Sequence, residues 1–364
     1  MENYIYLRAL RHAEHTVFCV QDGQKYYYDS EFGTREPYSS GQQVKRSILQ
    51  TLTDNLGVQM APIVFNYSIN KKQELNNKEP WSPCDPTYID QLIGGWMRAK
   101  GNSEKKDDSS EKDNSVIKRR SPLSISAMHP LHPLLAHLDS ENITFDRSDR
   151  PDANPVNVRM EGSNTPMTEE EIENFLNKNN RTLSRRTWIP NQARATGLFV
   201  FDIAIDLRTL FCVSTNQHEP EISKDTIAKL KDAGWIESKN VFGNCLVLPK
   251  KERDKVIPIL ANAIINWRIT SNQARTFSLM ETLAVTISND ANDIAAAIRA
   301  KLTDAGEKPK AKPIVDVNTN AKTFISLPCA NYIVTETESA DALKQAENEL
   351  IERLNAFDYE NQIK

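Results

Sequence analysis

Several short segments of the sequence mix positively charged side chains with small polar ones. Residues 41–46 read GQQVKR, 118–126 read KRRSPLSIS, 181–186 read RTLSRR and 267–275 read WRITSNQAR. Arginine and lysine bind phosphate groups, and serine, asparagine and glutamine supply further hydrogen bonds to phosphate and sugar. One such segment alone is typical of a solvated surface. Four of them together favour contact with the backbone of a nucleic acid.

The overall charge explains why such segments matter. The chain has 364 residues, 45 of them Lys or Arg and 49 Asp or Glu, so its formal net charge is −4. The field of the whole chain therefore gives no general attraction for nucleic acid, and local patches must supply it. Acidic residues gather elsewhere, for example in 165–174 and 347–360.

Side chains typical of metal or acid–base chemistry are present but poorly placed. Three histidines and an aspartate lie in HPLHPLLAHLD (129–139), where Pro130 and Pro133 break the helix that would align metal ligands. His12 and His15 lie three residues apart at a strand end and would point to opposite faces. No nucleophile elbow, P-loop or dinucleotide-binding glycine motif is present. We therefore expect no cofactor and no metal.

Asp29 is the best single candidate for a carboxylate that cuts a nucleic acid. It follows the tyrosines of 26–28 and precedes a loop, where an isolated aspartate usually forms a turn. Two-metal hydrolysis needs several converging ligands, and the spacing of Asp22, Glu31 and Glu36 does not indicate convergence. We expect no catalytic residue. The alternative is a metal-dependent RNase that uses Asp29.

The clearest helix spans 39–57, with Ser39 or Ser40 as its cap and Gly57 at its end. At about 100° per residue, its apolar side chains form one stripe: Val44, Ile48, Leu52 and Leu56. Lys45 falls inside this stripe and Arg46 falls outside it. Either Lys45 snorkels at the edge of the core, or the start of the helix faces a polar ligand. Spacing alone favours snorkelling.

The remaining elements are read from periodicity and turn signals. Strands are expected at 3–9, 16–20, 61–69, 197–207, 277–288 and 323–328. Helices are expected at 86–100, 165–180, 222–234, 251–267, 291–304 and 339–357. Hairpins are expected at 20–28, around an Asp-Gly turn, and between 142–147 and 156–160. Loops are expected at 71–80, 101–120 and 306–313, the second being low in complexity and mobile.

Strands and helices are mixed without strict alternation, which favours an α+β fold. Five cysteines without a CxxC pair argue against a disulfide framework and a zinc ribbon. The first residues lack the pattern of a secretory signal, and no apolar stretch is long enough to span a membrane. We expect a cytoplasmic protein.

The order of several segments resembles the CRISPR-associated backbone subunit of Cascade-type complexes, in the DevR-like branch of the RAMP superfamily. The resembling segments are YIYLRALRHAEHTVF, PYSSGQQVKRSIL, RRSPLSISAM, ATGLFVFDIAIDL and ANAIINWRITSNQARTFSLMETLAV, spread over most of 1–288. The resemblance implies a ferredoxin-like core, similar to an RNA-recognition motif, with large insertions. The core would comprise 1–69 and 193–364, and 70–192 would be the inserted subdomain.

The resemblance also implies an RNA-binding role. In that family copies polymerise along the guide RNA, a basic helix contacts its backbone, and a thumb hairpin displaces a nucleotide at regular intervals. The implied RNA contacts in this sequence are Gln42, Lys45, Arg46, Arg119, Arg120, Arg268, Asn272, Gln273 and Arg275. The thumb is expected within 141–160. The family's glycine-rich C-terminal loop is not evident in this sequence.

The sequence therefore predicts a non-catalytic guide-RNA-binding subunit of a CRISPR interference complex that acts in antiviral defence. Its expected partners are the guide RNA, target nucleic acid paired to that guide, copies of itself and other CRISPR-associated subunits, with no membrane.

Overall fold

The computed structural model describes residues 2–18, 23–98, 116–146, 155–184, 186–269, 279–326 and 337–363. The chain divides into two compact units. The first comprises Met1–Leu138 and Ala195–Lys364, and the second comprises Asp139–Arg194. This division differs from the expected insertion at 70–192, because strands between 116 and 138 join the main sheet of the first unit.

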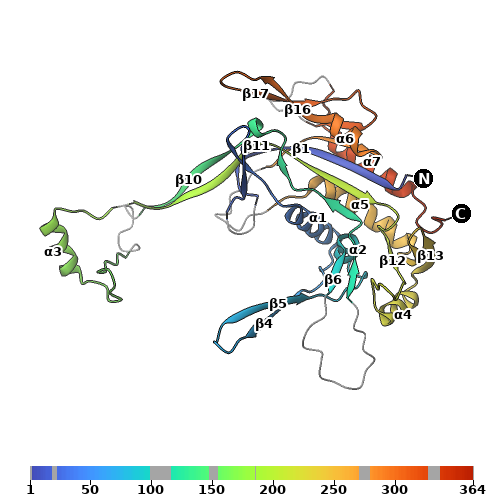
Figure 1. Ribbon diagram of the computed structural model, residues 1–364, viewed down its shortest axis with the longest axis horizontal. Coiled ribbons are helices and arrows are strands. Elements are labelled where there is room, and N and C mark those ends of the chain that lie inside the picture. Colours follow the sequence, from blue (N-terminus) through green and yellow to red (C-terminus); the bar gives the residue numbers. More distant parts are fainter. Residues whose placement is uncertain are drawn as a thin grey trace. The chain divides into compact units, whose positions relative to one another are not determined.

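The main sheet has the strand order β10-β11-β1-β15-β18, with β8 and β9 also paired to β11. Figure 1 labels β10, β11 and β1 of this sheet. Its strands are β1 (Tyr4–Thr16), β8 (Leu123–Ile125), β9 (His129–Pro130), β10 (Ala136–Asp146), β11 (Arg186–Asp206), β15 (Thr282–Ser288) and β18 (Lys322–Ile325). The pairs β1–β11, β1–β15, β8–β11 and β15–β18 are antiparallel.

Two long helices join these strands into a β-α-β-β-α-β path. The path runs β1, α1 (Gly41–Leu56), β8, β11, α5 (Lys250–Asn266) and β15, and the strands lie in the order β8-β11-β1-β15. A ferredoxin-like core requires this succession of elements. The predicted α+β class is confirmed.

The main core lies on one face of the sheet. Ile5, Leu7 and Ala9 of β1 alternate onto this face, where they share a cluster with Val44, Ile48 and Leu52 of α1 and with residues of α5. The helix α1 packs against α5, and α5 packs against α7 (Ala342–Ala356). The stripe predicted for 39–57 therefore faces the core.

The opposite face carries a smaller cluster around Leu10 and Val200, which includes Leu135 and Ile298. It is covered in part by η1 (Pro133–Leu135) and by the hairpin of β16 (Ile298–Asp304) and β17 (Lys310–Val315). The expected helix at 291–304 is wrong in its second half. The helix α6 (Ala291–Ala297) stops at Ala297, since Ile298 has an extended backbone and pairs with Val315.

Smaller elements complete the first unit. A three-stranded sheet contains β12 (Cys212–Ser214), β13 (Ile236–Asn240) and β14 (Gly243–Val247), beside α4 (Lys224–Asp232). Separate hairpins pair β2 (Tyr26–Asp29) with β3 (Thr34–Pro37), β4 (Val64–Ile69) with β5 (Leu75–Trp81), and β6 (Trp96–Arg98) with β7 (Ile117–Arg119). The short helix α2 (Ile89–Gly94) precedes β6, and α6 spans Ala291–Ala297.

These hairpins correct several expectations. The tyrosines at 26–28 pair with β3 through a turn at 30–33, and the first part of the hairpin expected at 20–28, including Asp22, lies outside the described residues. The expected loops 71–80 and 306–313 contain most of β5 and the start of β17, and the end of 101–120 contains β7. The expected helix 86–100 stops at Gly94, because Gly95 adopts a positive φ of 75°. The low-complexity part of 101–115 lies outside the described residues.

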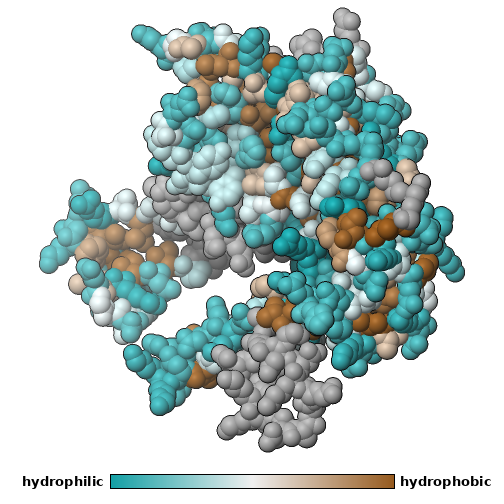
Figure 2. Space-filling model, turned by 45° about the vertical axis from the view of Figure 1, so that its right-hand side comes forward, coloured by the Kyte–Doolittle hydropathy of each residue, from teal (hydrophilic) through white to brown (hydrophobic). Residues whose placement is uncertain are grey.

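The second unit contains α3 (Glu169–Asn179) and the outer parts of β10 and β11. The hairpin expected between 142–147 and 156–160 is wrong, because β10 pairs with β11 and 155–160 forms no strand. A capping box between Thr168 and Glu171 starts α3, yet α3 buries none of its residues. Apolar side chains therefore remain at the surface of this unit, including Val156, Met160 and Phe175 (Figure 2). Among the described residues, no helix has both the length and the apolar character that crossing a membrane requires.

Candidate nucleic-acid interface

The first two turns of α1 place three predicted contact residues on one face. Ser40 caps the helix, and its side chain accepts a hydrogen bond from the Gln43 backbone N–H at 3.3 Å. Gln42, Lys45 and Arg46 follow at spacings that bring side chains together on a helix, and we name them the α1 basic surface. No acidic residue lies in the first turn, so the positive end of the helix dipole adds to their charge.

Gly41 fixes this surface to the sheet. A Cβ at Gly41 would lie 2.6 Å from the carbonyl oxygen of Ile125 in β8, so only glycine permits this close approach. Ser39 and Met128 also exchange two backbone hydrogen bonds of 2.9 Å just before the helix. Gly41 is therefore a positioning residue that sequence reasoning missed. The sequence does contain a signal for this role. Glycine has a low helix propensity, so a glycine at the first helical position after the cap is unusual.

Lys45 is the unusual member of the α1 basic surface. Its side chain is partly buried, and it makes no hydrogen bond or ion pair with any described residue. Burial and, to a smaller extent, the positive charge of nearby Arg119 lower the pKa of Lys45 to about 8. The fold thus holds a desolvated ammonium group beside a second cation, without a counterion among the residues described. Such an arrangement favours the binding of an anion.

Gln42 and Arg46 are exposed on the same face. Burial raises the pKa of Asp90, on α2, and the charge of Arg46 acts against that rise. Arg46 therefore lies close enough to Asp90 for the carboxylate to balance part of the positive charge of Arg46. Gln42 is free to donate to or accept from a ligand, since no hydrogen bond to a described residue engages its amide.

Arg119 requires a correction. It is only 4% exposed, and it donates hydrogen bonds to the carbonyl oxygens of Leu92, Thr209 and Cys212. Its guanidinium also lies 5.3 Å from the centre of the Trp96 ring. The pairing of β7 with β6 turns Arg119 inward and leaves Lys118 and Arg120 exposed, since side chains alternate along a strand. We therefore remove Arg119 from the predicted interface and retain Arg120.

Arg268 lies on the surface just beyond α5, and its Nη1 donates to the carbonyl oxygen of Leu279 at 3.0 Å. Burial lowers the pKa of its neighbour Arg11 to about 9, and the charge of Arg268 contributes in the same direction. No hydrogen bond joins Arg268 to the α1 basic surface within the described part of the chain. The other three predicted contacts of this loop, Asn272, Gln273 and Arg275, lie outside the described residues.

The carboxylate of Asp29 is engaged in a turn. Its Oδ1 accepts the backbone N–H groups of Glu31 at 3.0 Å and Phe32 at 2.8 Å. His132 has a similar local role, because its Nδ1 accepts the Leu134 N–H at 3.1 Å and caps η1. Within the described ranges, no group of three or more histidine, cysteine or acidic side chains is placed to hold a metal ion.

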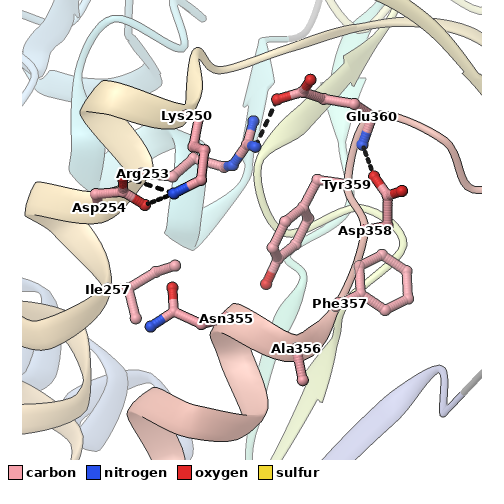
Figure 3. A pocket seen from close by; sticks show the side chains of 10 residues that line it. All are labelled: Lys250, Arg253, Asp254, Ile257, Asn355, Ala356, Phe357, Asp358, Tyr359 and Glu360. Atoms are coloured by element: carbon pink, nitrogen blue, oxygen red, sulfur yellow. Dashed lines mark hydrogen bonds and ion pairs between the residues drawn. The ribbon is translucent and has the colours of Figure 1, made fainter.

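A pocket of about 300 Å³ lies between α5 and the segment that follows α7 (Figure 3). Four of its charged groups form two ion pairs, Arg253 with Glu360 at 2.6 Å and Lys250 with Asp254 at 2.8 Å, and the carboxylate of Asp358 accepts the backbone N–H of Glu360 at 3.1 Å. None of the predicted RNA contacts lines it. We therefore do not include this pocket in the candidate interface.

The fold and the α1 basic surface define an α+β protein in which a partly buried cation at the start of the first long helix has no ion-pair partner among the described residues. No protein-family model matches the chain, and no curated protein matches it. Among the solved structures that match, one is named "CRISPR RNA-guided surveillance complex" and shares 10% identity at a TM-score of 0.35, covering 97% of this chain and 84% of that one. Another, named "CRISPR RNA-guided surveillance complex, pre-nicking", shares 10% identity at a TM-score of 0.41, covering 97% and 88%.

Proposed function

We propose that this chain binds guide RNA without cutting it, as a repeated backbone subunit of a CRISPR interference complex. The observation that carries the proposal is Lys45, a partly buried ammonium group without a partner among the described residues, next to the buried Arg119. An RNA phosphate supplies the missing counterion. The segment resemblance supports the same assignment, since it implies that the helix containing 41–46 contacts the RNA backbone.

The α1 basic surface suits a contact that ignores base identity. Phosphate binding by Lys45 and Arg46, with Gln42 beside them, fixes the position of a strand but carries no sequence information. Recognition of a target would then be left to base pairing with the guide, while the protein holds the backbone and the shape of the heteroduplex. Copies of the chain along one RNA, together with other subunits, would complete the complex.

The direct test is the nucleic acid that accompanies the purified protein. We expect protein made in cells that express a CRISPR array and the partner subunits to carry RNA of one uniform length. The length is read on a denaturing gel after phenol extraction, and RNase treatment confirms the nature of the polymer. Protein free of RNA, or carrying fragments of every length, contradicts the proposal.

We also propose that the subunit does not cleave RNA complementary to its guide. This rests on the turn-capping hydrogen bonds of Asp29, which engage one carboxylate oxygen. The assembled complex is incubated with labelled complementary RNA and magnesium or manganese, and the label is expected to remain intact. Cleavage at regular intervals that disappears in Asp29→Ala would establish the RNase alternative. Cleavage that survives this change would belong to a partner subunit or a contaminant.

A further inference from the structure

The hairpin β2–β3 lies immediately before α1 in the chain and has one face of distinctive composition. Tyr28 pairs with Arg35, and Tyr26 pairs with Pro37. Directly paired residues share a face of a two-stranded sheet, and alternate residues along a strand do too, so Tyr26, Tyr28 and Arg35 lie on one side. We name these three residues the Tyr-Arg face.

The Tyr-Arg face is exposed and positively charged. Tyr26 is 48% exposed and Tyr28 is 66% exposed, although aromatic side chains usually contribute to a core. The guanidinium of Arg35 lies 5.3 Å from the centre of the Tyr26 ring, and it forms no ion pair with any described residue. Two accessible aromatic rings thus flank a cation that has no counterion in the described part of the protein.

The acidic side chains of the hairpin strands lie on its other face. Asp29 shares that face with Tyr27 and caps the turn. Glu36 is 2% exposed, and its carboxylate accepts a hydrogen bond of 2.5 Å from the Tyr27 hydroxyl. The strands therefore separate their charges, with both carboxylates on one side and Arg35 on the other.

Buried contacts hold the hairpin in place. The Gln24 amide donates to the carbonyl oxygens of Lys25 at 2.8 Å and Tyr38 at 3.1 Å, and it accepts the Phe18 N–H at 2.7 Å. At the turn, the Phe32 ring packs against His132 with a centroid distance of 5.1 Å. Tyr26 and Tyr28 are therefore exposed on a hairpin that is held in place by other residues. Packing in the core does not explain why tyrosines occupy these two positions.

We propose that the Tyr-Arg face stacks unpaired bases of a single RNA strand, with Arg35 contacting the phosphate between them. The proposal rests on the proposed function, because the strand is the one whose backbone binds the α1 basic surface. Aromatic rings accept any base by stacking, and an adjacent arginine adds both charge and a planar contact. The contact therefore discriminates between a single strand and a duplex, in which the bases already stack on one another.

The test measures the affinity of the full chain for a guide-length single strand and for the same sequence as a duplex. Tyr26→Ala and Tyr28→Ala are each expected to weaken single-strand binding roughly tenfold, with little change for the duplex. Tyr26→Phe and Tyr28→Phe should bind as the parent does, since they retain the ring. Tyr67→Ala is the matched control, because Tyr67 is a 61% exposed tyrosine on the separate hairpin β4–β5.

A second measurement reports contact directly. RNA containing 5-iodouridine is irradiated on the protein, and the cross-linked peptide is identified by mass spectrometry. We expect the cross-link at Tyr26 or Tyr28. The inference about the Tyr-Arg face is overturned if both alanine variants bind RNA as the parent does and the cross-links lie elsewhere. If RNA binding still depends on Lys45 in that case, the proposed function stands. Absence of RNA binding by the parent chain overturns the proposed function and this inference together. Loss of binding to a partner protein at unchanged RNA affinity also overturns the inference, because the face would then be a protein contact.

Discussion

Replacement of Lys45 by glutamate is expected to weaken RNA binding by roughly tenfold to a hundredfold, equally for all guide sequences. A charged hydrogen bond to phosphate contributes about 1.5–3 kcal/mol, and the reversed charge would also repel the strand. The measurement is affinity against salt concentration, where loss of one phosphate contact lowers the slope by about 1. Lys45→Arg is the matched control and should retain most of the affinity.

Lys45→Met separates a binding role from a structural one. The variant keeps an unbranched side chain but removes an ammonium group whose pKa burial has lowered to about 8. Removing a desolvated charge is expected to raise the melting temperature, and loss of the phosphate contact is expected to lower the RNA affinity. A variant that is more stable but binds RNA less well cannot owe its weaker binding to unfolding. Unchanged affinity and salt slope in Lys45→Met and Lys45→Glu would exclude this helix as the contact.

The lowered pKa of Lys45 also predicts a pH dependence in the same experiment. Lys45 is mostly charged below pH 8 and loses its proton above it, because its pKa in the free protein is about 8. RNA affinity is therefore expected to fall as pH rises from 7 to 9. Lys45→Arg should bind equally across this range, since arginine stays charged. A parent protein with a flat profile would show that Lys45 does not carry the contact.

Replacement of Arg119 by alanine is expected to lower the free energy of unfolding by about 3 kcal/mol or more. The change removes a buried donor from the carbonyl oxygens of Leu92, Thr209 and Cys212, of which that of Thr209 keeps the Cys212 N–H at 3.4 Å, and each group left unpaired costs about 1–3 kcal/mol. It also removes the ion pair with Glu221 at 3.8 Å. The measurement is chemical denaturation followed by circular dichroism.

Arg120→Ala provides the control for Arg119. Arg120 is the next residue in the chain and is exposed, so its loss should change the free energy of unfolding by no more than about 0.5 kcal/mol. The same variant should reduce RNA affinity if Arg120 contacts phosphate. An Arg119→Ala protein that is as stable as the parent yet binds RNA poorly would return Arg119 to the interface.

Local signals in the sequence were sufficient for the α+β class and for the helix that starts at Gly41. The cap at Ser40, the end at Gly57 and the apolar stripe between them are set by residues within a few turns of one another. Sequence reasoning failed where pairing depends on distant segments. The sequence pattern predicts that the strand at 142–147 pairs with 156–160, whereas β10 pairs with β11, some 40 residues further along the chain.

The sequence by itself determined that Lys45 falls inside the apolar stripe of its helix, because helical periodicity fixes the direction of each side chain relative to its neighbours. It left open whether that position meant snorkelling or a ligand. Only the tertiary structure decided that Arg119 is buried near it and that no described residue forms an ion pair with Lys45. The physical reason is that desolvation and charge proximity depend on which segments pack together. The charge of Arg119 acts on Lys45 from a strand more than 70 residues away in the sequence, and no spacing within either segment predicts that proximity.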